Sequence, residues 1–198
     1  MLSFLPQVTQ DELEELAQRY GQPLVRTIHL SSHKPFDPLN KSDRYGEVCM
    51  VVRRLNGQLL TMKKVPYPAN AYRLLTGGIN HGESIFNALL REVHEETGLE
   101  VTITHFLAAV AYHIGSPDDQ PVFYTFAFLL DEISGTLETI DEGEQVEAFH
   151  EIATHELPQL AEYLDQLSPH SHENDDYWSN WGKFRAVIHR IVWEALTV

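Results

Sequence analysis

The sequence contains a single cysteine, Cys49, among its 198 residues. One thiol cannot form an intrachain disulfide, and it cannot supply the cysteine sets of zinc or iron–sulfur sites. No stretch approaches the roughly 18 consecutive apolar residues of a transmembrane helix. The opening residues, MLSFLPQVTQDELEEL, lack the basic start and long apolar run of a secretory signal peptide. These absences predict a cytoplasmic protein without a membrane partner.

Basic residues are missing from almost half of the chain. Residues 92–182 contain no Lys or Arg but twenty Asp and Glu, whereas residues 1–91 contain eleven basic and eight acidic side chains. The formal net charge of the whole chain is −15. So acidic a tract repels nucleic acid and anionic lipid, and we expect neither as a partner. A phosphate-bearing small molecule must then bind through the basic first half or through a metal ion.

The first 44 residues have the pattern of a helix followed by a strand. Thr9 and Glu12 have the spacing of a capping box, apolar residues follow at helical spacing, and Gly21 fits the stop. Residues 24–30 are typical of a strand, and the loop that follows is rich in Pro, Ser and Asp. We therefore predict an N-terminal extension over residues 1–44, packed on a main domain over residues 45–198.

Strands and helices are mixed in the main domain without regular β-α-β alternation. We expect strands from Gly46 and over 58–65, 101–112 and 122–130, and helices over 84–97, 156–167 and 181–196. Asn56-Gly57, between apolar runs, predicts a hairpin in which both residues adopt positive φ. The pattern favours an α+β or α/β fold in which a mixed β-sheet lies between helices, the last of them C-terminal.

One helix concentrates carboxylates on a single side. Residues 77–99 read GGINHGESIFNALLREVHEETGL. At about 100° per residue, Glu96 projects about 40° from Glu92, and Glu95 lies within about 60° of Glu92. Such carboxylates repel one another and are costly to bury unpaired. A hard cation such as Mg²⁺ or Mn²⁺ resolves both problems, because it prefers oxygen ligands and leaves positions for water and phosphate.

Glycines precede this helix. Gly77, Gly78 and Gly82 predict a tight turn in which the backbone approaches a ligand closely, so we expect a substrate contact at Gly78. Glu83 lies eight residues before Arg91. A salt bridge between these two side chains would fix the loop against the helix.

The segment resembles the Nudix box, in which Gly, five residues, Glu, seven residues, Arg-Glu, an aliphatic residue, any residue, Glu-Glu, any residue, Gly and an aliphatic residue follow in order. Every specified position matches, from Gly77 to Leu99. The residue before the glycines is often proline in the family and is Thr76 here. The resemblance implies a mixed sheet between helices. It also implies hydrolysis of a nucleoside diphosphate linked to another group.

The resemblance also implies roles for individual residues. The implied metal ligands are Glu92, Glu95, Glu96 and the Gly77 carbonyl. Glu83 and Arg91 are the implied structural pair. Bound ions would bridge the diphosphate and activate a water, so Glu95 and Glu96 take part in catalysis.

Many relatives use a further glutamate, from a loop well after the box, as general base or extra ligand. Residues 138–151 occupy that place. Glu144 is the first choice and Glu147 the second, because GEQVEAF resembles the family's acidic lead into a late strand. A solvated acidic loop is the alternative interpretation.

Phosphate contacts must come from basic residues outside the acidic tract. The candidates are Arg44, Arg53, Arg54, Lys63, Lys64 and Arg73. Arg73, four residues before Gly77, is the first choice, whereas Arg53 and Arg54 beside the hairpin fit a solvated rim better. His170 and His172 fit no zinc pattern, so we interpret the polar loop over residues 168–180 as solvated.

The sequence therefore predicts a Mg²⁺- or Mn²⁺-dependent Nudix hydrolase. Its substrate class stays open among ADP-ribose or another nucleoside diphosphate sugar, a nucleoside triphosphate, a dinucleoside polyphosphate and a coenzyme. The N-terminal extension favours a larger substrate or a homodimer. The alternative is a non-catalytic Nudix-like sensor that binds a nucleotide, although we would expect its box to be eroded.

Overall fold

Strand β2 (Arg44–Arg53), near the middle of the sheet, is buried on both faces. Alternate side chains of a strand point to opposite faces. Val48 accordingly packs into one hydrophobic cluster, and Cys49 packs into another. The strand therefore separates two cores, each of which needs its own cover of helices.

The computed structural model describes residues 2–30, 36–114, 121–167 and 175–198. The other strands are β1 (Leu24–Leu30), β3 (Leu59–Lys64), β4 (Arg73–Asn80), β5 (Leu99–Ile114), β6 (Phe123–Gly135) and β7 (Val146–Ile152). The α-helices are α1 (Gln7–Tyr20), α2 (Ile85–Thr97), α3 (Leu157–Asp165) and α4 (Asp175–Thr197). Short 3₁₀ turns span Leu2–Phe4, Glu142–Glu144 and Thr154–Glu156.

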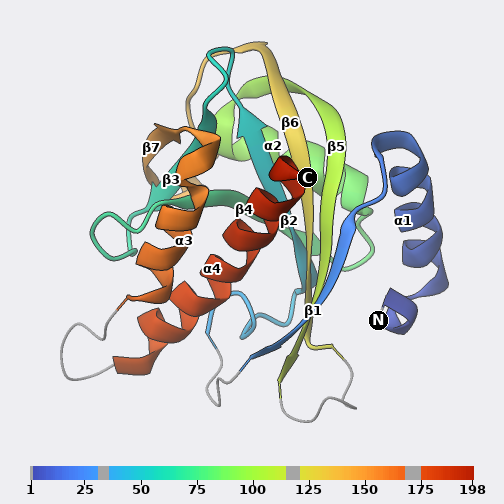
Figure 1. Cartoon of the computed structure of the whole chain (residues 1–198). Helices are drawn as coiled ribbons and strands as arrows, with labels where there is room; N and C mark the ends of the chain where they lie inside the picture. The colour runs from blue at the N-terminus through green and yellow to red at the C-terminus, as the bar shows by residue number, and fades with distance from the viewer. Residues whose placement is uncertain (1, 31–35, 115–120, 168–174) are drawn as a thin grey trace.

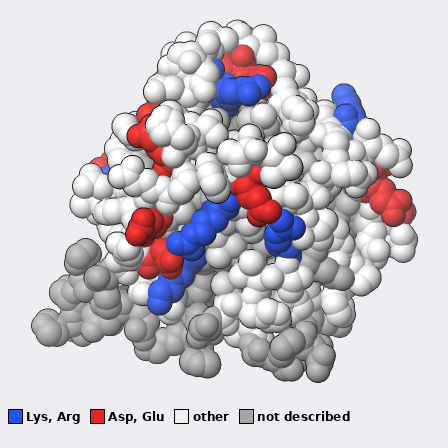
Figure 2. All heavy atoms as spheres, viewed as in Figure 1, with Lys and Arg blue, Asp and Glu red and all other residues white. Residues whose placement is uncertain are grey.

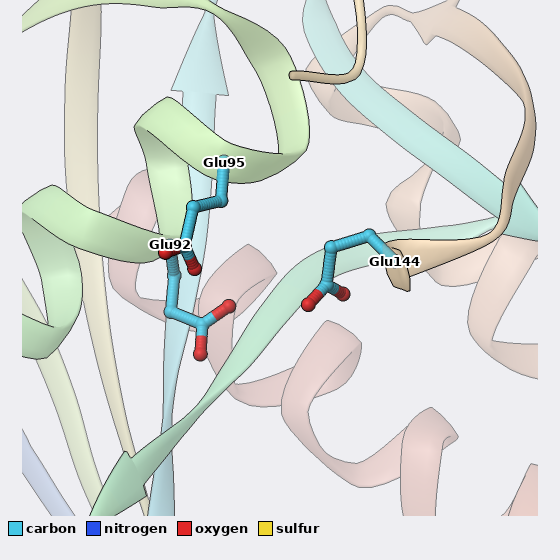
Figure 3. A group of neighbouring side chains, drawn as sticks. All are labelled: Glu92, Glu95 and Glu144. Atoms are coloured by element: carbon cyan, nitrogen blue, oxygen red, sulfur yellow. The ribbon is translucent and has the colours of Figure 1, made fainter. Parts of the chain in front are cut away.

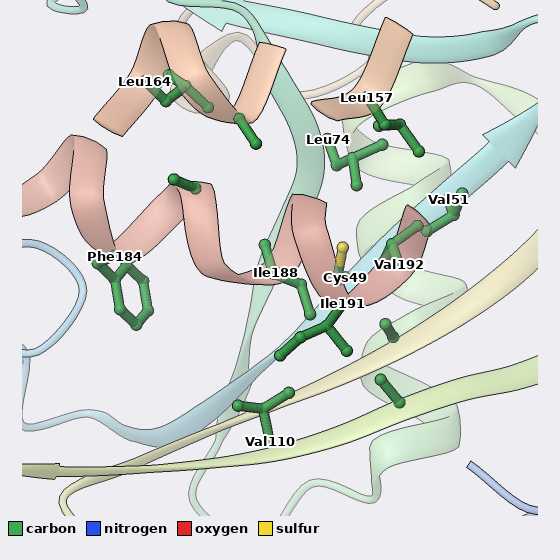
Figure 4. Close-up of a cluster of buried hydrophobic side chains, with 14 of the residues drawn as sticks. Cys49, Val51, Leu74, Val110, Leu157, Leu164, Phe184, Ile188, Ile191 and Val192 are labelled. Atoms are coloured by element: carbon green, nitrogen blue, oxygen red, sulfur yellow. The ribbon is translucent and has the colours of Figure 1, made fainter. Parts of the chain in front are cut away.

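The strands form one seven-stranded mixed sheet in the order β1-β5-β6-β2-β4-β3-β7. The β1–β5 and β2–β6 pairs are parallel, and the other neighbours are antiparallel. Helices α3 and α4 cover one face, and α1 and α2 cover the other (Figure 1). Figure 4 shows the first of these cores, where Leu164 of α3 and Ile188 of α4 lie on the same side of the sheet as Cys49. The predicted mixed sheet between helices is confirmed.

The strand predicted over residues 24–30 has the bounds of β1. It forms one edge of the sheet and pairs in parallel with β5, from Leu24 opposite Ala108 to Leu30 opposite Ile114. The chain before residue 44 therefore contributes a strand to the same sheet as the rest of the molecule.

The predicted capping box at the start of α1 is wrong. The helix begins at Gln7, and its N-cap residue is Pro6, which makes no side-chain cap. Thr9 is buried inside the first turn instead. Glu12 does cap a helix, but that helix is α2, because its carboxylate accepts hydrogen bonds from the backbone of Ile85.

The hairpin at Asn56-Gly57 forms, but with a different turn. Gly57 has a φ of 84°, whereas Asn56 is not among the residues with positive φ. Gly57 N donates to Arg54 O at 2.8 Å, and Arg54 N donates to Gln58 O at 2.8 Å. These bonds define a three-residue loop in which only the glycine needs the left-handed region.

Several of the predicted boundaries move. The strand predicted over 122–130 is β6, which extends to Gly135, and residues 175–180 of the predicted polar loop belong to α4. The last helix begins at Asp175, six residues before the predicted start at 181. The strand predicted over 101–112 extends from Leu99 to Ile114. His170 and His172 lie outside the described residues. No helix in the described part of the chain has the length and apolar character needed to cross a bilayer.

Part of the uneven charge of the sequence is paired in space. Arg53 bonds Asp131 at 2.8 Å, and Arg54 bonds Glu132 at 2.6 Å and Glu151 at 2.9 Å. Figure 2 shows acidic and basic side chains next to one another on the face seen in Figure 1. Basic residues of the first half thus neutralise acids of the tract over 92–182.

Candidate functional site

Helix α2 carries the predicted acidic residues. Ser84 is its N-cap, and the Ser84 hydroxyl accepts a hydrogen bond from Asn87 N at 3.2 Å. Gly98 ends the helix in the left-handed conformation, with a φ of 64°. The helix therefore has the predicted bounds, and its buried face runs from Ile85 to Glu96.

Three carboxylates converge at one end of this face. Glu92 and Glu95 project from α2 toward Glu144, which lies in the loop before β7 (Figure 3). One oxygen from each of the three lies within 4.8 Å of the others. Burial raises the pKa of Glu92, although the hydrogen bond from Arg91 opposes this shift. Three carboxylate oxygens at this separation fit a hard divalent cation, which prefers oxygen ligands.

Glu96 lies behind this cluster rather than in it. The side chain is fully buried, and neither oxygen accepts a hydrogen bond within the described part of the chain. Its Oε1 lies 3.1 Å from Lys64 Nζ, which also donates to Glu144 Oε2 at 2.5 Å. Burial raises the pKa of Glu96 to about 7, although Lys64 and Arg73 oppose the shift. Lys64 thus links Glu96 to Glu144.

Arg91 is held by several oxygens. Its Nε and Nη2 donate to the two oxygens of Glu83, each at 2.8 Å, so the pair is bidentate. Its Nη1 donates to Glu92 at 2.8 Å and to Glu95 at 3.0 Å, and its Nη2 donates to Gly78 O at 2.9 Å. The hydrogen bonds from Arg91 lower the pKa of Glu83. The guanidinium therefore fixes the loop, the strand and the carboxylates relative to one another.

The prediction of a tight turn at Gly77 and Gly78 is wrong. Both lie in β4, where they pair with Val48 and Glu47 of β2. Their lack of a side chain serves another purpose. A Cβ atom on Gly77 would overlap the Glu92 carboxylate, and one on Gly78 would overlap a guanidinium that lies over it. Gly82 does have positive φ, at 80°.

A cavity of about 450 Å³ opens at this site. Its lining includes Gly77, Gly78, Glu92, Glu95 and Glu144. Six basic side chains also line it, namely Lys41, Arg44, Lys64, Arg73, Arg91 and Arg185. The cavity therefore brings acidic and basic groups to one surface, as an anionic substrate bound through a cation requires.

The remaining basic candidates lie away from the described lining. Arg53 and Arg54 pair with acids of β6 and β7, and Lys63 pairs with Glu147 at 2.6 Å. Glu147 is thereby separated from Glu144, which lines the cavity. The structure brings Glu144 to the α2 carboxylates and leaves Glu147 paired with Lys63, outside the described lining of the cavity.

Sequence reasoning missed Arg185, the residue that α4 contributes to the cavity lining. Arg185 Nη1 donates to both oxygens of Glu47 at 2.8 Å and to Thr76 Oγ1 at 3.1 Å, and both members of the ion pair are buried. All of the basic residues predicted to contact phosphate lie in the first half of the chain. The signal was available, because Arg185 lies between the apolar residues Phe184 and Ala186 of the helix predicted over 181–196.

Two curated proteins are similar in sequence to this chain. An ADP-ribose pyrophosphatase of Methanocaldococcus jannaschii is 31% identical over 109 residues, which cover 54% of this chain and 60% of the relative. An RNA pyrophosphohydrolase of Baumannia cicadellinicola is 37% identical over 65 residues, 33% of this chain and 40% of the relative. The chain thus spans less than two thirds of the length of these curated relatives.

Solved structures were also compared with the chain. A MutT NUDIX hydrolase from Burkholderia pseudomallei shares 21% identity, with a TM-score of 0.46, over 77% of this chain and 98% of that one. The profile of the NUDIX domain matches residues 44–173, well over half of the chain. The matched segment includes the entire box and the carboxylate cluster. The chain therefore belongs to the NUDIX domain family.

Proposed function

We propose that the protein hydrolyses a pyrophosphate bond in a nucleoside diphosphate linked to another group, with Mg²⁺ or Mn²⁺ as cofactor. The observation that carries this proposal is the convergence of Glu92, Glu95 and Glu144 on a cavity that basic side chains also line. Family membership supports it, and both curated relatives are named for pyrophosphate chemistry. The substrate is a small molecule rather than RNA, because the acidic tract repels nucleic acid.

In this proposal Glu92, Glu95 and Glu144 hold the cation, with the carbonyl of Gly77 beside them. When bound, a divalent ion neutralises the diphosphate charge and lowers the pKa of a bound water. Glu96 contributes negative charge from behind the cluster and holds Lys64 at 3.1 Å. A divalent cation would reduce the repulsion among the three carboxylates.

The surrounding residues of the chain act by positioning. Arg91, clamped by Glu83, orients Glu92 and Glu95 through its Nη1. Glu144 lies opposite α2 on a different element, so it is the residue that we assign to take the proton of the attacking water. Arg73 and the backbone of Gly78 contact the phosphates, because both line the cavity.

A substrate panel tests this function. The purified protein is incubated with ADP-ribose, other nucleoside diphosphate sugars, nucleoside triphosphates and dinucleoside polyphosphates, with Mg²⁺, Mn²⁺ or EDTA, and released monophosphates are measured. We expect metal-dependent release with at least one substrate and its loss in Glu95→Gln. Glu100→Gln, a matched change at an exposed site, keeps the activity.

Two results would count against the proposal. One is the absence of hydrolysis with every diphosphate, and if nucleotides still bind tightly, that result favours the sensor. The other is full activity of Glu95→Gln, which would remove the carboxylate cluster from the mechanism.

A further inference from the structure

The basic side chains of the cavity differ in how their charge is balanced. Five of the six lie within 4.0 Å of a carboxylate. The partners are Asp37 for Lys41, Asp43 for Arg44, Glu96 and Glu144 for Lys64, Glu83, Glu92 and Glu95 for Arg91, and Glu47 for Arg185. Arg73 forms no salt bridge with any residue that the structure describes. Among the described residues, no carboxylate oxygen therefore lies within 4.0 Å of the Arg73 guanidinium.

Arg73 is also buried, with 2% of its surface exposed. Its Nε and Nη2 donate to the Tyr67 hydroxyl at 3.1 and 3.0 Å, and its Nη1 donates to Leu74 O at 2.8 Å and to Thr76 Oγ1 at 3.0 Å. All of these acceptors are neutral. A guanidinium does not lose its proton in a protein, so Arg73 is buried as a cation. Burying a charge without a counter-charge is costly, and a bound anion would remove that cost.

Thr76 adds a second guanidinium to the same place. Its Oγ1 accepts from Arg73 Nη1 at 3.0 Å and from Arg185 Nη1 at 3.1 Å. Two buried guanidiniums thus share one hydroxyl, and of the two only Arg185 also bonds a described carboxylate, that of Glu47. The Nε of Arg185 is buried and has no hydrogen-bond partner among the described residues. Thr76, which stands where the family often has proline, therefore joins the two guanidiniums.

Tyr67 contributes a hydrogen-bond donor. Its hydroxyl oxygen accepts both N–H groups from Arg73, so its own hydrogen is free to donate elsewhere. The part of the chain that the structure describes offers no acceptor for it. The ring packs against Trp181 in a tilted arrangement, with ring centroids 4.6 Å apart, and Tyr67 lines the cavity. A phosphate oxygen would accept from this hydroxyl and from the guanidinium together.

Arg73, Arg185 and Tyr67 form a basic corner of the cavity, which lies next to the carboxylate cluster. Lys64 stands between the two, because its Nζ bonds Glu144 while the charges of Arg73 and Glu96 both act on it. In the proposed function, the cluster would hold the cation that binds the cleaved diphosphate. The corner is thus placed to bind an anionic group that follows that diphosphate.

We propose that Arg73, Tyr67 and Arg185 form a phosphate subsite, and that the substrate carries at least one phosphate beyond the cleaved diphosphate, as a nucleoside triphosphate or a dinucleoside polyphosphate does. This inference rests on the proposed function. A nucleoside diphosphate sugar would place an uncharged hydroxyl group against Arg73 and leave its charge unbalanced. The subsite therefore selects the polyphosphates from the substrates that the sequence left open.

The first test measures binding without turnover. Inorganic tripolyphosphate is titrated calorimetrically into the full chain in EDTA, where hydrolysis does not interfere. We expect Arg73→Gln to weaken binding about tenfold or more, because a charged hydrogen bond is lost. Tyr67→Phe, which removes only a hydroxyl, weakens binding several-fold and serves if Arg73→Gln fails to fold. Arg53→Gln, which changes an arginine paired with Asp131 outside the cavity lining, leaves binding unchanged.

The second test measures selectivity. The ratio of kcat/KM for a nucleoside triphosphate to kcat/KM for ADP-ribose falls about tenfold or more in Arg73→Gln and is unchanged in Arg53→Gln. An equal loss with both substrates would overturn the subsite, as would tripolyphosphate binding that is independent of Arg73 and Tyr67. If the unmodified protein hydrolyses no substrate but binds tripolyphosphate through Arg73, the proposed hydrolysis is overturned and the phosphate subsite stands.

Discussion

Glu12 accepts a hydrogen bond from the backbone N–H of Ile85 at 3.1 Å, and its other oxygen accepts from Phe86 N at 2.9 Å. A side chain of α1 thus satisfies two free N–H groups at the start of the helix that carries the carboxylates. The negative charge also lies at the positive end of the helix dipole. The first helix of the chain therefore helps to fix the position of α2.

Replacing Glu12 by Ala should lower the free energy of unfolding by about 1–2 kcal/mol, because two backbone donors lose their partner. The matched control is Glu14→Ala, which removes an exposed carboxylate from the same helix. Urea denaturation of both variants measures the difference. Equal stabilities would show that the contact between Glu12 and α2 contributes nothing.

Glu144 and Glu147 form a second matched pair. Glu144 belongs to the carboxylate cluster, whereas Glu147 bonds Lys63 and is not among the described residues that line the cavity. Glu144→Gln should lower kcat by about a hundredfold or more, the usual contribution of a proton-transfer group, while the chain stays folded. Glu147→Gln should keep activity close to that of the unmodified protein. The opposite ranking would move the catalytic role to Glu147.

Gly77→Ala should weaken metal binding, since the new Cβ would displace the Glu92 carboxylate from the cluster. Changes next to metal ligands typically reduce affinity about 10- to 100-fold. Gly78→Ala is the control, because its Cβ meets the end of the long Arg44 side chain, which is free to move. Titration with Mn²⁺, followed by its paramagnetic signal, compares the two variants. Equal affinities would mean that Glu92 is not a ligand.

The pH dependence of stability should contain a contribution from His189. This side chain is fully buried; its Nε2 accepts from Leu74 N at 2.9 Å, and its Nδ1 bonds Arg185 O at 2.7 Å. Burial lowers the pKa of His189 to about 3. Below about pH 6.5 the unfolded state takes up a proton that the folded state does not, so the free energy of unfolding falls as the pH falls towards 3.

Comparison with His189→Asn isolates this contribution from other titrating groups. The variant should be less stable than the unmodified protein at pH 7, and the difference should shrink between pH 6.5 and pH 4. Thermal unfolding at several pH values measures both. A difference that stays constant with pH would show that His189 is not held neutral in the folded state.

The local parts of the site were predictable from sequence, because spacing alone decides them. Helical periodicity placed Glu92 and Glu96 on the buried face of α2, and Gly98 marked its end. Gly77 and Gly78 led to the wrong prediction of a turn, because glycine is used both in tight turns and where another group packs closely against the backbone. Gly77 lies in a strand, and only the fold shows that Glu92 occupies the space where its side chain would be.

The non-local parts were not predictable. Nothing in the spacing of Thr76 and Arg185, 109 residues apart, indicates that they bond. Their contact requires α4 to dock on β4. Two interactions hold α4 there: the packing of its buried apolar residues and the hydrogen bond from Leu74 N to His189. Glu144 is an intermediate case. Its family position suggested it, but the choice over Glu147 depends on which of the two carboxylates meets Glu92 and Glu95 in the fold.

The ion pair between Glu47 and Arg185 has a consequence for the protein while it is being made. The two residues are 138 positions apart. At roughly 5–20 residues per second, the ribosome adds Arg185 about 7 to 28 s after Glu47. During that interval β2 has no cation for the carboxylate that it must bury, so a nascent chain that ends before α4 holds an incomplete cavity. The charge of Glu47 is therefore balanced by Arg185 only after α4 has been made.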